Sequence, residues 1–85
     1  MKLQPEAVVF GERLRELREK RGETVRSLAE QMGMSFAYLS EMERGVKVPS
    51  LTTIIRLAIA LDCKVTDLVD TFNRRNLRSL VPPTK

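Results

Sequence analysis

A glycine at position 33 separates two short stretches that each carry their own helix signals. Thr24 is a favourable N-cap for the first stretch, and Gly33 can end that helix because glycine accepts a left-handed backbone without strain. Ser35 can cap a second helix directly afterwards. The apolar face of the first helix consists of Leu28, Ala29 and Met32. Residues 24–45 therefore predict two short helices that cross at a steep angle.

The second of these helices sorts its residues clearly by face. At about 100° per residue, Leu39 and Met42 point to one side, with Tyr38 and Glu43 at its margins. The other side, here called the recognition face, is made of Phe36, Ala37, Ser40, Glu41 and Arg44. This mixture is unsuitable for a core and suits a helix that enters a DNA groove. Any short amphipathic helix also shows a polar face to water, so the pattern alone leaves both interpretations open.

Five helices are predicted in all, without strands or repeats. The first runs from about Glu6 to Arg21 with Pro5 at its start, the fourth opens at Pro49 and Ser50, and the fifth spans about Val65–Phe72. The residues expected in the core of these three helices are Phe10, Leu14 and Leu17, then Leu51, Ile54, Leu57, Ala58 and Leu61, and finally Val65 and Leu68.

The composition limits the kinds of catalysis and metal binding that we expect of this chain. A chain of 85 residues with 42% hydrophobic residues fits one small domain. It has no histidine, which is the usual general base near neutral pH and the commonest metal ligand. Its single cysteine, Cys63, is better explained as a small buried residue than as a redox sensor. We therefore expect a protein that is not an enzyme and that needs no cofactor, metal or small-molecule ligand.

The net charge of +4 is concentrated at one end of the chain. Residues 73–85 contain four basic residues, Arg74, Arg75, Arg78 and Lys85, and no acidic one. This predicts a domain over residues 1–72 and a basic tail over residues 73–85, where Pro82 and Pro83 favour a frayed end. No apolar run approaches the roughly 18 residues needed to cross a bilayer, and no signal peptide is recognisable, so a cytoplasmic protein without a membrane partner is expected.

The run from Phe10 to Leu68 resembles the phage-repressor-like (Xre-type) helix-turn-helix family, which includes controller proteins of restriction-modification systems. The similar segments are FGERLRELREKRG, SLAEQMGMS, YLSEMERG and PSLTTIIRLAIALD, at residues 10–22, 27–35, 38–45 and 49–62. They cover about two thirds of the chain in the family's order and spacing. The resemblance implies an all-α, compact five-helix bundle of the lambda-repressor-like type, with the third helix as its recognition helix.

The resemblance also implies which residues meet DNA. The base-contacting positions correspond to Phe36, Ala37, Ser40 and Glu41, and the phosphate-contacting positions to Val25, Tyr38, Arg44 and Lys47. Phe36 and Ala37 depart from the family's frequent glutamine or arginine and offer only apolar contact, for example to a thymine methyl. Direct readout would then depend on Glu41, which can accept from a cytosine amino group, and on Ser40, which is permissive. Val25 replaces a frequent glutamine, which leaves the backbone N–H groups to bind phosphate.

A structural ion pair is implied between Arg18 and Glu43. In the family these positions form a buried or half-buried pair beside the DNA backbone. Losing one member of a desolvated pair is costly, whereas a surface pair contributes little. The plain alternative is that Arg18 and Glu43 are two unrelated surface charges.

The fourth helix carries more apolar surface than its own core requires. Ile55 and Ile59 lie beside the buried stripe, and the family usually has a polar residue at position 59. With Val69 and Phe72 they could form a two-fold homodimer interface. Alternatively, Leu77, Leu80 and Val81 of the tail fold back over the two isoleucines within one chain.

The sequence thus predicts a homodimeric, sequence-specific transcriptional regulator of repressor or controller type that binds double-stranded DNA. The competing hypothesis is a helix-turn-helix used as a protein-interaction module, such as an antitoxin component that binds its partner through Phe36 or the tail. A fall of duplex affinity with rising salt distinguishes the two, because phosphate contacts release counterions.

Overall fold

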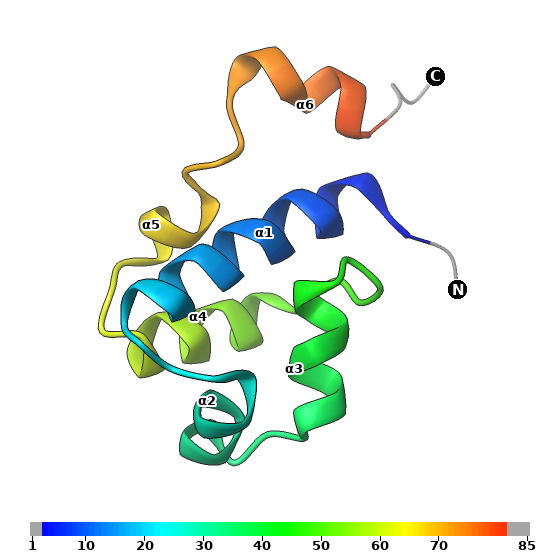
Figure 1. The fold of residues 1–85 in the computed structure, drawn as a ribbon. Helices are drawn as coiled ribbons and strands as arrows, with labels where there is room; N and C mark the ends of the chain where they lie inside the picture. Colours follow the sequence, from blue (N-terminus) through cyan, green and yellow to red (C-terminus); the bar gives the residue numbers. More distant parts are fainter. Residues whose placement is uncertain (1–2, 82–85) are drawn as a thin grey trace.

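A computed structural model describes residues 3–81 as an assembly of helices, with no strand in that range (Figure 1). The helices are α1 Pro5–Lys20, α2 Val25–Met32, α3 Phe36–Glu43, α4 Leu51–Ala60, α5 Val65–Val69 and α6 Arg74–Leu80. The all-α prediction is confirmed. Two details differ: α5 ends at Val69 instead of Phe72, and the tail contains a sixth helix that was not predicted.

Side-chain caps set the helix boundaries. The Thr24 hydroxyl accepts from Ser27 N at 3.0 Å, and the Ser27 hydroxyl accepts from Thr24 N at the same distance. Ser35 and Ser50 accept from backbone N–H groups three residues later in the same way. Gly33 has a left-handed backbone with φ of 63°, so the predicted glycine turn between α2 and α3 is present.

The core lies where α1, α2, α3, α4 and α5 meet. In the order of the chain, α1 packs against α3 and α5, α2 packs against α3 and α4, and α4 packs against α5. The largest fully buried side chains are Leu14, Leu28, Leu39, Met42, Leu57 and Leu68. All six were expected on apolar faces.

Leu51 was wrongly expected in the core, because its side chain is 69% exposed. Leu51 is the first residue of α4, and the inward position of this turn is taken by Thr53, which is buried. The Ser50 hydroxyl donates to the Thr53 hydroxyl at 3.0 Å, so a cap interaction satisfies the buried threonine. The apolar periodicity of α4 therefore begins one turn later than its first leucine.

Helix α6 is set apart from the core. Asn73 caps it by accepting from the backbone N–H of Arg75 and Asn76, at 2.9 and 3.2 Å. None of its residues is buried, and Figure 1 shows it on the side of α1 away from α2 and α3. A frayed tail was thus the wrong expectation for residues 74–80. Pro82, Pro83 and Lys85 lie outside the described residues.

The fold-back of the tail over Ile55 and Ile59 is also wrong. Leu77 and Val81 are more than half exposed, and Leu80 with its neighbours borders a shallow cleft beside residues 3–6 at the start of α1. The apolar face of α6 therefore approaches the beginning of α1 and leaves the two isoleucines of α4 uncovered.

Candidate nucleic-acid interface

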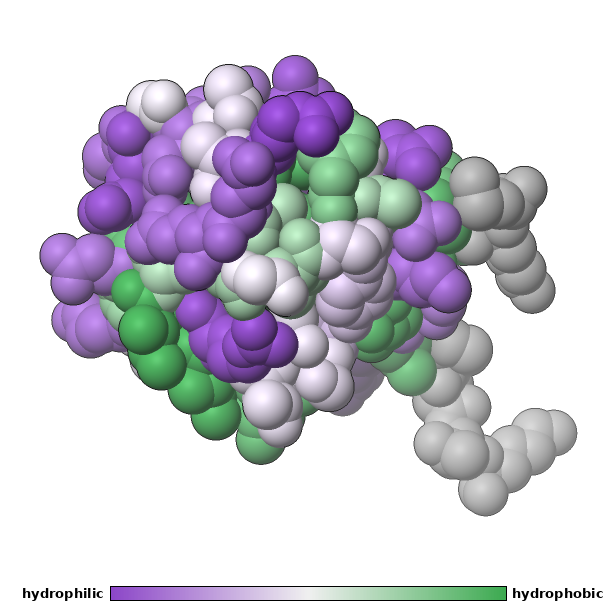
Figure 2. Space-filling model, turned by 90° about the horizontal axis from the view of Figure 1, so that it is seen from below, coloured by the Kyte–Doolittle hydropathy of each residue, from purple (hydrophilic) through white to green (hydrophobic). Residues whose placement is uncertain are grey.

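The recognition face lies on the outside of α3. Leu39 and Met42 are fully buried on the inner side of the helix. On the outer side Phe36, Ala37 and Arg44 are exposed, and Ser40 and Glu41 are half-buried. Figure 2, which shows the molecule from below Figure 1, presents this end as a mosaic of hydrophilic and hydrophobic residues. The structure thus brings the four predicted base-contacting residues together on one accessible face.

The four predicted phosphate-contacting residues fall into two groups. Arg44 caps the end of α3 and Lys47 follows in the next loop, and both are exposed. Tyr38 and Val25 are half-buried and pack against the core. The two cations are therefore free to reach phosphates, whereas the Val25 side chain serves packing and its position offers only the N–H groups at the start of α2.

Arg18 and Glu43 form a buried, two-point ion pair. Arg18 Nε donates to Glu43 Oε2 at 2.6 Å and Arg18 Nη2 donates to Glu43 Oε1 at 3.0 Å. Their side chains are only 9% and 7% exposed. The hydrogen bond to Glu43 raises the pKa of Arg18 above its ordinary value and outweighs the opposing effect of burial. A third donor, Arg18 Nη1, binds the carbonyl of Glu23 at 2.6 Å, so this arginine joins α1, α3 and the start of α2.

Close backbone contact fixes the end of α3 against α1. A Cβ at Gly11 would lie 2.4 Å from the carbonyl oxygen of Met42 and 2.5 Å from that of Glu43. Gly45, with φ of 80°, is equally confined, because its Cβ would lie 2.5 Å from the Val8 side chain. Gly11 was not among the site residues predicted from the sequence. Its signal was a glycine inside a helix that otherwise favours larger residues.

The predicted dimer residues differ in their exposure. Ile55 is 44% exposed and Ile59 is 74% exposed, and Leu51 continues their stripe one turn earlier on α4. Val69 and Phe72 instead pack against the core of their own chain, where they line a small apolar cleft with Ile54. Ile59 borders a different hollow, beside Met32 and Arg56. The exposed apolar residues of α4 are Leu51, Ile55 and Ile59, here called the α4 stripe.

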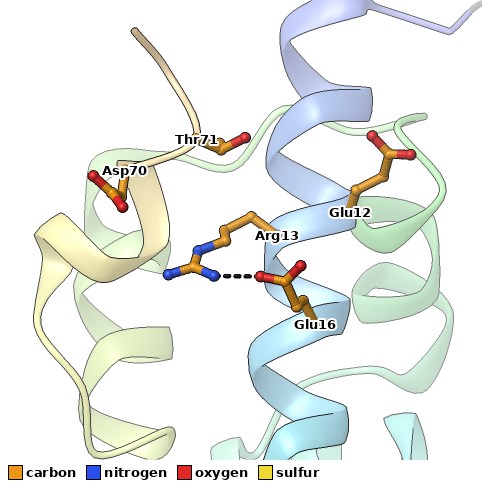
Figure 3. Close-up of a pocket in the computed structure, with 5 residues that line it drawn as sticks. All are labelled: Glu12, Arg13, Glu16, Asp70 and Thr71. Atoms are coloured by element: carbon orange, nitrogen blue, oxygen red, sulfur yellow. Dashed lines mark hydrogen bonds and ion pairs between the residues drawn. The ribbon is translucent and has the colours of Figure 1, made fainter.

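The hollows on the surface offer few side chains that could react or bind a ligand. Figure 3 shows a shallow one between α1 and the end of α5, lined by Glu12, Arg13, Glu16, Asp70 and Thr71. Arg13 is already engaged there, because it pairs with Glu16 and its Nε donates to the carbonyl of Asp67 at 2.7 Å.

Burial raises the pKa of the Cys63 thiol, which disfavours a reactive thiolate. Within residues 3–81, no cluster of three histidine, cysteine or carboxylate side chains could hold a metal ion, and no helix is long and apolar enough to cross a membrane.

Comparison with known proteins places this arrangement among helix-turn-helix proteins. Residues 14–68 match the helix-turn-helix (HTH_3) family. The crystal structure of the restriction-modification controller protein C.AhdI from Aeromonas hydrophila is 41% identical, has a TM-score of 0.72, and aligns with 74% of this chain and 96% of its own. The clp gene regulator ClgR from C. glutamicum is 37% identical with a TM-score of 0.73, over 76% of this chain and 84% of its own.

Curated relatives show the same similarity over part of their length. The transcriptional regulator DdrOP3 of Deinococcus deserti is 44% identical over 59 residues, which are 69% of this chain and 46% of DdrOP3. The regulator SinR of Bacillus subtilis is 32% identical over 73% of this chain and 57% of its own. The chain thus spans about half the length of these two relatives.

Proposed function

Because this chain belongs to the helix-turn-helix (HTH_3) family of DNA-binding transcriptional regulators, we propose that it is a sequence-specific regulator of repressor or controller type that binds double-stranded DNA as a homodimer. The observation that carries the proposal is the exposed recognition face of α3, held on α1 by the buried Arg18–Glu43 pair. A helix that reads bases needs a fixed orientation, and this pair together with the Gly11 contact provides one. The protein acts by binding and not by catalysis.

Each side chain of the recognition face has a role that its chemistry allows. Phe36 and Ala37 pack against thymine methyl groups, and Glu41 accepts from a cytosine amino group in the major groove. Arg44 and Lys47 bind the phosphates beside the groove and orient the protein without reading sequence. The N–H groups at the start of α2 add a neutral phosphate contact.

Homodimerisation through the α4 stripe supplies the second recognition helix. Leu51, Ile55 and Ile59 follow one another at intervals of four residues and are all exposed, which makes a continuous apolar surface along α4. A two-fold pairing of this stripe would place two copies of α3 in successive major grooves, roughly 34–36 Å apart. This interface keeps Ile55 and Ile59 of the predicted set and adds Leu51, whereas Val69 and Phe72 are half-buried and pack against the core of their own chain.

Salt dependence of duplex binding tests the DNA-binding proposal. Arg44→Ala and Lys47→Ala should each weaken binding to all sequences alike and reduce the logarithmic salt slope by about one unit, because one phosphate fewer is neutralised. Arg78→Ala is the matched control, because Arg78 is an exposed arginine on α6, on the far side of α1. A wild type that binds no duplex at low salt would overturn the proposal and favour the protein-interaction module, in which the exposed Phe36 contacts a partner.

Sedimentation of the wild type and of Ile59→Lys tests the dimer. The lysine should dissociate the dimer, because pairing would bury an unmatched charge, and should leave the monomer core intact since Ile59 is 74% exposed. Leu77→Lys on α6 is the control and should sediment like the wild type. A wild type that is monomeric at about 50 μM, well above the dissociation constants of typical specific interfaces, would exclude the dimer.

A further inference from the structure

Arg26 of α2 and Phe36 of α3 are in contact across the glycine turn. The guanidinium carbon of Arg26 lies 4.7 Å from the centre of the Phe36 ring. Arg26 is the second residue of α2 and Phe36 is the first residue of α3, so the contact spans the glycine turn. Both side chains are exposed, and Phe36 is 45% exposed. The pair therefore lies at the entrance of the recognition helix, in contact with solvent.

Stacking leaves the donors of Arg26 available. Over residues 3–81, Arg26 takes part in none of the ion pairs, and it donates none of the side-chain hydrogen bonds. A guanidinium that lies over an exposed aromatic face is attracted by the ring, and its plane can stack on that face. Its N–H groups project from the edge of that plane. Arg26 is thus a preoriented donor without an internal acceptor.

The recognition face has no side chain in the first turn of α3 that can donate hydrogen bonds to a base. Arg26 would supply this missing donor. Phe36 and Ala37 carry no hydrogen-bonding group, and the next polar side chains of the recognition face are Ser40 and Glu41. No residue of α3 before Arg44 can donate two hydrogen bonds to a guanine edge. Arg26 brings a planar fork of donors to this position from the neighbouring helix.

We propose that Arg26 and Phe36 form one base-reading unit, in which Arg26 donates to O6 and N7 of a guanine and Phe36 packs against the methyl group of an adjacent thymine. The inference rests on the proposed DNA-binding function and names part of its target. A guanine edge has two acceptors that match the arginine fork, and a thymine methyl is the apolar group that the major groove offers to the ring. Phosphate binding would not require the stack, because a phosphate accepts donors from many directions.

Selection of bound duplexes from a random pool tests this unit with four proteins: wild type, Arg26→Ala, Arg26→Lys and Phe36→Ala. The wild type should select a thymine-guanine step in each half-site. Arg26→Ala should lower the preference for that guanine by about 5- to 150-fold, the range for one bidentate contact. Arg26→Lys keeps the charge and should lose most of the same preference, since lysine lacks the planar fork. Phe36→Ala should lose the thymine preference and weaken the guanine preference, because the stack is gone.

The outcomes separate this inference from the function on which it rests. Selective binding by the wild type with the same selected sequence for Arg26→Ala would overturn the inference alone. Equal weakening on all duplexes, with a salt slope reduced by about one unit, would also overturn it and make Arg26 a phosphate contact. Absence of duplex binding by the wild type would overturn the proposed function and this inference with it. Thermal unfolding of all four proteins should agree within a few degrees, because both residues are exposed.

Discussion

Helices α3 and α6 are similar in length and in their side-chain caps, yet they are held to the molecule in different ways. Helix α3 has eight residues and a serine cap, and α6 has seven residues and an asparagine cap. Leu39 and Met42 of α3 are fully buried, whereas α6 has no buried residue. Helix α3 is thus fixed by fully buried side chains, whereas α6 depends on its caps and on half-buried contacts.

The difference agrees with the work each helix is proposed to do. A recognition helix must present its side chains at a constant angle, and α3 is attached to α1 by the Arg18–Glu43 pair and by the backbone contact at Gly11. The end of α6 lies beside residues 3–6 at the start of α1, where the two segments border a shallow cleft. Substitutions in the contacts of α3 should therefore reduce the free energy of unfolding much more than substitutions in α6.

The largest effect is expected for Glu43→Ala. It leaves the buried guanidinium of Arg18 without its carboxylate, which should reduce the free energy of unfolding by about 3–5 kcal/mol. Glu19→Ala is the control, because its pair with Arg15 is exposed and should contribute at most about 0.5 kcal/mol. Urea unfolding of both variants measures the difference. Similar stability of the two would mean that the buried pair does not hold α3.

A smaller loss is expected for Gly11→Ala. Alanine is the better helix former, but its Cβ would lie 2.4 Å from a backbone carbonyl of α3, so the two helices must separate. Overpacking of this kind costs about 1–3 kcal/mol. Urea unfolding gives the stability, and the duplex affinity of the folded variant reports the displaced recognition helix. A variant that matches the wild type in both measurements would show that α1 and α3 can move apart freely.

The smallest effect is expected for Leu77→Ala on α6. Leu77 is 51% exposed, so its truncation should change the free energy of unfolding by less than about 1 kcal/mol. The matched substitution in α3 is Leu39→Ala, which removes a fully buried side chain and should cost about 2–5 kcal/mol. A loss for Leu77→Ala that approaches the loss for Leu39→Ala would place α6 in the core and remove the contrast between the two helices.

Local signals in the sequence accounted for much of the fold. Thr24, Ser35 and Ser50 are caps in the structure as predicted, and Gly33 makes the expected turn. Helix α6 was not predicted, because the charges and prolines of the tail favour a frayed end and its one clear helix signal is the cap residue Asn73. Periodicity alone cannot distinguish the first turn of a helix from its middle, which is why Leu51 was misplaced.

The site was less accessible to reasoning from the residues alone. The recognition face followed from helical spacing, but the partnership of Arg18 with Glu43 came from the family resemblance, since 25 positions separate them. The contact between Arg26 and Phe36 was not predicted from the sequence. It depends on how α2 and α3 cross at the turn, and no spacing within either helix encodes that angle.

The contact at Gly11 has a mechanical consequence. Where α1 and α3 touch, backbone lies against backbone, with no flexible side chain between them to absorb a displacement. A movement that tilts α1 is therefore expected to tilt α3 with it. The opposite flank of α1 faces α6 (Figure 1), so a tilt of α1 imposed from that flank would change the orientation of α3. The same close contact that fixes the orientation of α3 therefore couples that orientation to the position of α1.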